Sequence, residues 1–232
     1  MNNYGVLNLD EWYAKEITEA SYNELITLTT WINKIYGYHP FIIGGWAVYS
    51  YAKSLGSRDI DIIFPTKDSV EKVLMPYYKM RGYREEGLFS KSFYLELKTE
   101  KGNEKIMLDA CSLSDHNILH ENTDIELSWD LTQHYYQEWN LQKDIIVQVP
   151  QIELLLVYKI KALCDRRYDL QHTSLSAINK SYINSKIWKD EYDITTLSKS
   201  KIEKEKINRI IKTTNFTEYF QRELKRLKIN FS

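Results

Sequence analysis

The chain has 232 residues, 43% of them hydrophobic and 27% charged, a composition typical of globular domains with a buried core. Its formal net charge of −1 excludes a chain-wide attraction to nucleic acids or anionic membranes, so such an attraction would need a local patch. The two cysteines, Cys111 and Cys164, favour a reducing compartment over a disulfide scaffold. Because the sequence shows no secretory signal and no apolar run of membrane-spanning length, we expect a cytoplasmic protein with no membrane partner.

The first part of the chain alternates between helical and strand patterns. Apolar spacing predicts one or two amphipathic helices over residues 9–36, ended by Tyr38-His39-Pro40. An apolar run at 41–43 and a second run within 57–64, which carries Asp59 and Asp61, predict strands on either side of a helix over 46–55. A further helix is expected over 68–81, closed by Gly82.

Strand patterns continue to residue 149, and the rest of the chain is helical. Strands are expected at 82–86, 92–97, 105–111 and 144–149, with a hairpin turn at Lys101-Gly102-Asn103. The polar segment 112–123 is interpreted as a loop, and its two histidines lack the further ligands of a zinc site. We therefore predict an α+β protein: a small mixed sheet flanked by helices over 1–149, followed by a helical domain over 150–232.

The stretch around residues 41–64 contains candidate metal-binding and phosphate-binding residues. Asp59 and Asp61, spaced i, i+2 on one predicted strand, would share a face and repel each other unless a cation lies between them. Such oxygen ligands suit Mg²⁺. Gly44 and Gly45 let backbone N–H groups approach a phosphate at the start of a helix. The combination predicts a nucleotide site, whereas either element alone fits an ordinary strand–turn–helix with solvated aspartates.

The order Gly-Gly, helix, Asp-Ile-Asp resembles the nucleotidyltransferase superfamily related to DNA polymerase β. The resemblance implies transfer of a nucleoside monophosphate from ATP or another NTP to an acceptor hydroxyl, with two Mg²⁺ ions (Mn²⁺ as a substitute) held by Asp59, Asp61 and a third carboxylate. Asp109 is the candidate for that carboxylate, with Glu96 in reserve. The alternative role for Asp109 is to cap the turn that follows its strand. The triphosphate would be neutralised by Gly44, Gly45, Ser57 and Arg58.

A second set of residues narrows the resemblance. Lys159-Ile160-Lys161-Ala162, followed by Arg166-Arg167 and later by Lys189 to Ile194, resembles the nucleotidyltransferases of abortive-infection type toxin–antitoxin systems. By that likeness Lys159 would hold the triphosphate, and Asp190 or Asp193 would steady the nucleotide or the lysine. The two halves of this motif stand further apart than is usual in that branch. The alternative for Lys159 is a helix residue that snorkels to water.

The sequence does not identify the acceptor of the nucleoside monophosphate. The toxin-like branch implies RNA such as tRNA, or a protein, and an antitoxin as a partner. The alternatives are an antibiotic-type small-molecule nucleotidyltransferase and a catalytically silent nucleotide-binding relative. From residue 198 onward ten Lys and Arg face four Glu, which indicates either a solvated helical face or a patch for RNA phosphates.

Overall fold

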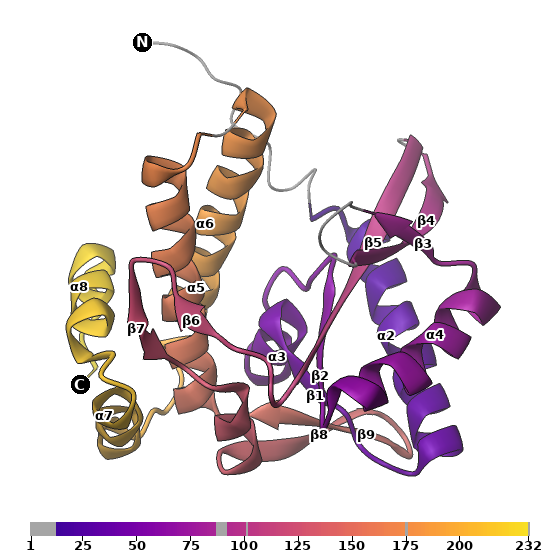
Figure 1. The fold of residues 1–232 in the computed structure, drawn as a ribbon, viewed down its shortest axis with the longest axis horizontal. Coiled ribbons are helices and arrows are strands. Elements are labelled where there is room, and N and C mark those ends of the chain that lie inside the picture. The colour runs from indigo at the N-terminus through magenta and orange to yellow at the C-terminus, as the bar shows by residue number, and fades with distance from the viewer. Residues whose placement is uncertain (1–12, 87–91, 101, 175, 232) are drawn as a thin grey trace. The chain divides into compact units, whose positions relative to one another are not determined.

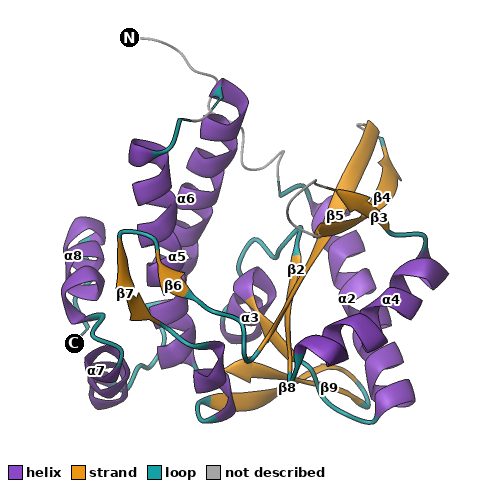
Figure 2. Ribbon diagram, viewed as in Figure 1, coloured by secondary structure: helices purple, strands orange, loops and turns teal. Residues whose placement is uncertain are grey.

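A computed structural model describes residues 13–86, 92–100, 102–174 and 176–231 (Figure 1). The chain divides into two compact units. The sheet unit comprises Tyr13–Asp115 and Trp129–Gln151, and the helical unit comprises His116–Ser128 together with the described residues after Gln151. The predicted α+β class is confirmed, because a mixed sheet with its own helices is followed by a largely helical part (Figure 2).

The sheet unit contains a seven-stranded sheet in the order β3-β4-β5-β2-β1-β9-β8. The pairs β2–β5 and β1–β9 are parallel and the other pairs are antiparallel, so the sheet is mixed as predicted. The hairpin expected around Gly102 joins β4 to β5. The strands are β1 (Phe41–Ile43), β2 (Ile60–Phe64), β3 (Arg84–Glu86), β4 (Ser92–Thr99), β5 (Gly102–Ser112), β8 (Tyr136–Gln142) and β9 (Ile145–Pro150).

The two faces of the central strands differ in polarity. Ile60 and Ile62 of β2 and Leu108 of β5 are buried almost completely. Helices α2 (Lys15–Tyr36) and α4 (Lys67–Arg81) contact these strands. Because successive side chains alternate between faces, Asp61 and Asp109 lie on the opposite face, which is partly open to solvent. We call the two faces the core face and the carboxylate face.

Glycines set several helix ends. The first helix stops at Tyr36, as predicted, and it stops there because Gly37 adopts the left-handed conformation (φ 68°). Helix α3 (Gly44–Tyr51) starts at the double glycine and stops before Leu55, so the helix predicted over 46–55 is displaced. Helix α4 ends at Gly82 as predicted. The part of the first predicted helix before residue 13 lies outside the described residues.

The helical unit is built around α5, which the other helices contact. It includes a small hairpin of β6 and β7, where the sequence indicated only a loop. That prediction is wrong because distant groups pin the segment: Asp165 of α5 accepts the backbone N–H of His120 (2.9 Å), and the Asn117 side chain donates to the Leu127 carbonyl (2.9 Å). The elements are β6 (Ile118–Leu119), β7 (Asn122–Glu126), α5 (Ile152–His172), α6 (Ala177–Leu197), α7 (Lys204–Thr213) and α8 (Thr217–Leu227).

The predicted single boundary near Pro150 differs from the observed division. The chain does pass from the sheet unit to the helical unit between Gln151 and Ile152. However, His116–Ser128, placed by the sequence in the first domain, packs with the helices because β6 contacts α5. The 3₁₀ helix Trp129–Gln133 and strand β8, which the sequence did not indicate, then return the chain to the sheet.

A buried carboxylate joins α2 to α4 in the sheet unit. Glu24 is 3% exposed and accepts hydrogen bonds from the hydroxyls of Tyr77 (2.7 Å) and Tyr83 (3.1 Å). The Arg81 guanidinium adds an ion pair at 2.5 Å. The Glu24 carboxylate on α2 thus accepts hydrogen bonds from two donors on α4, Tyr77 and Arg81, and from Tyr83, which lies just after the end of α4.

Replacing Glu24 with glutamine is expected to lower the free energy of unfolding by about 1.5–3 kcal/mol, because hydrogen bonds to a charged acceptor are replaced by weaker ones and Arg81 loses its counterion. Urea denaturation followed by circular dichroism measures the change. The matched control is Glu19→Gln on the exposed side of the same helix, whose pair with Lys15 is solvated. Equal unfolding midpoints for the two variants would contradict this role of Glu24.

Candidate active site

Two of the three predicted carboxylates lie side by side. Strands β2 and β5 are parallel neighbours, and Asp61 is in register with Asp109. In-register residues on adjacent strands point to the same face and stand about 5 Å apart. The carboxylate face therefore carries a pair of like charges, an arrangement that favours a bound cation.

Asp59 occupies a different position from the predicted one. It lies in the bend before β2, which starts at Ile60, so the prediction that Asp59 and Asp61 share a strand is wrong. Strand alternation therefore does not determine the direction of the Asp59 side chain. Within the described ranges, no three or more His, Cys, Asp or Glu side chains are grouped so as to hold a metal ion.

The donor chemistry nevertheless fits the ion implied by the resemblance. The in-register pair supplies carboxylate oxygens, the ligand type that Mg²⁺ takes together with water and substrate phosphates. Asp59 adds a third carboxylate two residues before Asp61 in the sequence. The residues that would hold a divalent ion are therefore Asp61 and Asp109, and Asp59 stays a predicted third ligand.

The double glycine packs directly against this face. Gly44 follows β1 with φ 66°, and a Cβ added there would lie 1.9 Å from Oδ2 of Asp61. A Cβ on Gly45 would lie 2.8 Å from the Ser57 hydroxyl oxygen. Strand β1, helix α3 and the segment before β2 therefore meet at positions where only glycine leaves enough space. The first backbone N–H groups of α3 lie beside the Asp61 carboxylate.

The Gly44→Ala variant is expected to be destabilised by about 1–2 kcal/mol, because an L-residue is strained at positive φ. Its methyl group would also displace the Asp61 carboxylate, so nucleotide affinity should fall. Thermal unfolding and a titration with a non-hydrolysable NTP measure the two effects. Gly37→Ala is the matched control, since it has a similar φ and nothing within 4 Å of the added Cβ. If both variants bind nucleotide equally well, the close approach of Gly44 to Asp61 has no functional role.

Arg58 and Glu96 are engaged elsewhere. The Arg58 guanidinium, 9% exposed, pairs with Glu104 of β5 at 2.6 Å and so ties the segment before β2 to its neighbouring strand. Glu96, exposed on β4, pairs with Arg84 at 3.1 Å. Its register partner is Lys105, four residues before Asp109 on β5. Glu96 is therefore displaced along the sheet from the carboxylate pair.

The carboxylates affect a neighbouring thiol. Burial, together with the charges of Asp115, Asp61 and Asp109, raises the pKa of Cys111 to about 12. The neutral thiol form is therefore favoured, which argues against a nucleophilic role for Cys111. The same charges give this part of the sheet a negative potential that favours a cation.

In the helical unit, Lys159 is part of a buried charge cluster. Its ammonium lies 3.1 Å from Oδ1 of Asp190 and 2.8 Å from Oδ2 of Asp193. Lys189 also pairs with Asp193, and Arg166 pairs with Asp190. The two halves of the motif, separated in sequence, meet because α5 and α6 form a helical hairpin (Figure 1).

This buried charge cluster changes the interpretation of Lys159. The side chain is 11% exposed, so it does not snorkel to water. Burial lowers the pKa of Lys189 to about 8, the nearby Asp193 opposes that shift, and the Lys159 charge adds to it. Three cations and two carboxylates leave one formal positive charge. The roles of Lys159 and Asp193 in binding a nucleotide stay predictions.

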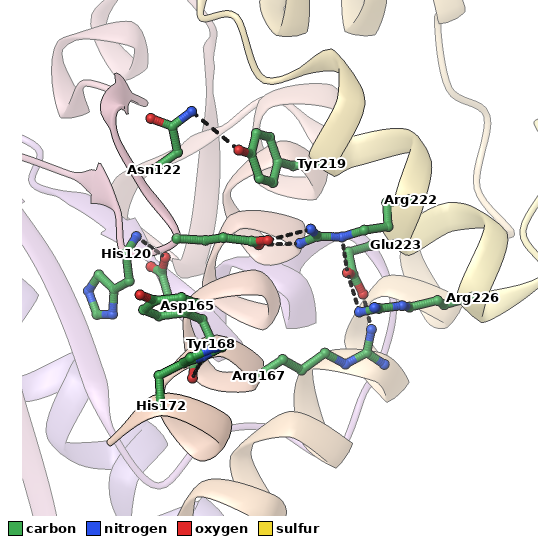
Figure 3. Close-up of polar contacts among 11 residues, drawn as sticks. His120, Asn122, Asp165, Arg167, Tyr168, His172, Tyr219, Arg222, Glu223 and Arg226 are labelled. Atoms are coloured by element: carbon green, nitrogen blue, oxygen red, sulfur yellow. Dashed lines mark hydrogen bonds and ion pairs between the residues drawn. The ribbon is translucent and has the colours of Figure 1, made fainter. Parts of the chain in front are cut away.

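A second network holds α8 in place (Figure 3). Glu223, which is fully buried, accepts hydrogen bonds from the guanidinium groups of Arg167, Arg222 and Arg226. Arg222 also makes a bidentate pair with Glu121 at 2.8 and 2.6 Å. Arg222 and Arg226, which belong to the basic segment after residue 198, therefore serve the internal packing of the helical unit.

Comparisons with known proteins give limited information. No protein family and no curated protein matches the sequence. One solved structure that resembles this chain is that of the antibiotic-resistance factor ANT(2'')-Ia. The identity is 16%, the similarity covers 88% of this chain and 97% of that one, and the TM-score is 0.44. Similarity at this level assigns no activity. None of the helices in the described part of the chain is long and apolar enough to cross a membrane.

Proposed function

We propose that the protein is a metal-dependent nucleotidyltransferase that moves a nucleoside monophosphate from an NTP to an acceptor hydroxyl. The observation that carries the proposal is the register of Asp61 with Asp109 on the carboxylate face, against the Gly44 turn. Two neighbouring like charges repel each other, and a catalytically silent protein has no need to keep them. The resemblance of the motif to the polymerase β-related superfamily implies that this carboxylate pair holds divalent ions for nucleotidyl transfer.

The roles of the residues follow from their positions. Backbone N–H groups at the start of α3, beginning with Gly44 and Gly45, would donate to the triphosphate, with the Ser57 hydroxyl beside them. Asp59, Asp61 and Asp109 would hold the ions, and Asp109 would also accept the proton of the acceptor hydroxyl. A divalent ion bound there supplies charge neutralisation of the phosphates. Positioning and neutralisation together provide most of the rate.

For the acceptor, we place a small hydroxylated molecule of the antibiotic kind first. RNA such as tRNA was favoured by the basic tail, but Arg222 and Arg226 pair with Glu223, and Lys206 lies 3.6 Å from the carboxylate of the buried Glu153. Cations paired in this way offer less to phosphates than exposed ones. RNA is the second candidate, because the tail still has more cations than anions. A protein acceptor and an antitoxin partner stay predictions.

Incubation of the protein with Mg²⁺, each α-labelled NTP and separate pools of antibiotics, tRNA and proteins tests the proposal. Label is expected in one pool, while γ-labelled NTP transfers none, because pyrophosphate leaves. Mg²⁺ should raise the melting temperature only when an NTP is present, since the ion takes part of its ligand shell from the phosphates. The absence of label from every pool, together with no NTP-dependent stabilisation, would contradict the proposed function.

A further inference from the structure

A pocket of about 570 Å³ lies on the core face of the sheet, between α4 and the strands β4 and β5. Its apolar wall is formed by Val70, Leu74, Tyr78, Phe93 and Ala110. We propose that this pocket binds a small planar aromatic cation. Its volume lies in the range of small-molecule sites, which combine an apolar lining with a few polar groups.

The pocket is separate from the candidate active site. Ala110 lines it, and Asp109, the preceding residue on β5, points to the carboxylate face by strand alternation. Phe93 is in register with the buried Leu108, which also belongs to the core face. The proposal therefore does not depend on the proposed function, and a ligand in the pocket would not compete with an NTP at Asp61 and Asp109.

The shape of the wall favours a flat ligand. The rings of Tyr78 and Phe93 are stacked, with centroids 4.1 Å apart and planes 18° from parallel. Met75, which also lines the pocket, is 50% exposed. Methionine is flexible and polarisable, so it adapts to the edge of an aromatic ring. A planar aromatic body of two or three fused rings matches this lining.

The charges around the pocket favour a cation. Lys67 and Asp115 pair with each other at 3.0 Å, and Asp115 also accepts the backbone N–H of Ser112 at 2.7 Å. These two side chains therefore neutralise each other. Glu71 is exposed, and no hydrogen bond or ion pair joins it to another described residue. Among the described residues, the polar rim carries one net negative charge, located on the exposed side chain of Glu71.

Three naphthalene probes of equal size test the proposal with the full-length protein: 1-naphthylmethylammonium, 1-naphthalenemethanol and naphthalene-1-sulfonate. Isothermal titration calorimetry is expected to show one site per chain, with the ammonium probe binding at least tenfold more tightly than the sulfonate. The Glu71→Gln variant should lower the affinity for the ammonium probe to that for the alcohol. The matched control is Glu218→Gln, which replaces an exposed glutamate on α8 and should leave the affinities for the ammonium probe and for the alcohol unchanged. Addition of Mg²⁺ and a non-hydrolysable NTP should leave the probe affinity unchanged.

A second variant tests the location. Val70→Trp places a large side chain in the pocket and should abolish binding of all three probes, while circular dichroism verifies its fold. The proposal is overturned if the parent protein binds no probe saturably, if the sulfonate binds as tightly as the ammonium, or if Glu71→Gln keeps the preference for the cation. Because Glu71 is exposed, that variant folds whether or not Val70→Trp does, and it decides the outcome.

Discussion

The Asp61→Asn variant is expected to lose nucleotidyl transfer by about 10³-fold, the effect of removing one charged group from a preorganised site. Asparagine has nearly the same shape, so the packing of this side chain against Gly44 should survive. The fold should be as stable as that of the parent or slightly more stable, because one of two neighbouring like charges is removed. Transfer of α-labelled NTP and the melting temperature are the two measurements.

Asp68→Asn is the matched control, because Asp68 is exposed on α4 and its ion pair with Lys72 is long and solvated. Asp109→Asn should match Asp61→Asn, and the double variant should be no worse than either, since residues that act as one unit are not additive. If the Asp61→Asn variant retains the activity of the parent, the carboxylate pair is not required for nucleotidyl transfer.

The Asp193→Ala variant is expected to destabilise the helical unit by about 3–5 kcal/mol, the cost of breaking a buried ion pair from one side. Asp193 is fully buried, and its carboxylate faces both Lys159 and Lys189. Without this carboxylate, the positive charges of Lys159, Lys189 and Arg166 are compensated less completely in a medium of low dielectric constant. Urea denaturation followed by circular dichroism measures the loss.

The charge argument is tested by a rescue experiment. Adding Lys189→Met to Asp193→Ala removes one uncompensated cation and should restore part of the stability, whereas loss of packing alone would not be restored. Asp124→Ala, at an exposed position on β7, is the control and should change stability by less than about 0.5 kcal/mol. A parental unfolding midpoint for Asp193→Ala would show that the buried charge cluster contributes nothing.

Local sequence patterns indicated which residues belong to the candidate site, but they did not indicate how these residues are arranged in space. The double glycine, the aspartate in β2 and the aspartate in β5 were recognisable from short runs of sequence. Their register was not, because Asp61 and Asp109 are paired by strands far apart in the chain. Asp59 was misplaced because the alternation rule was extended beyond the first residue of β2.

The same limit applies to Lys159. Helical spacing correctly placed this residue on a buried stripe of α5. The sequence offered two outcomes, snorkelling or an external anion, because its actual partners stand on α6, about thirty residues away. Its replacement should therefore affect folding as well as nucleotide affinity. The hairpin of β6 and β7 was missed for a similar reason, since its partners lie on α5 and α8.

The interleaved chain path determines the order in which the two units can form during translation. The sheet unit needs no residue after Gln151, so it can close while the C-terminal helices are still being synthesised. Glu121 leaves the ribosome early but meets Arg222, 101 residues later, only when α8 has been made. The hairpin of β6 and β7 therefore lacks this partner until α8 has been synthesised. Long-range contacts with α8, rather than local helix formation alone, complete the helical unit.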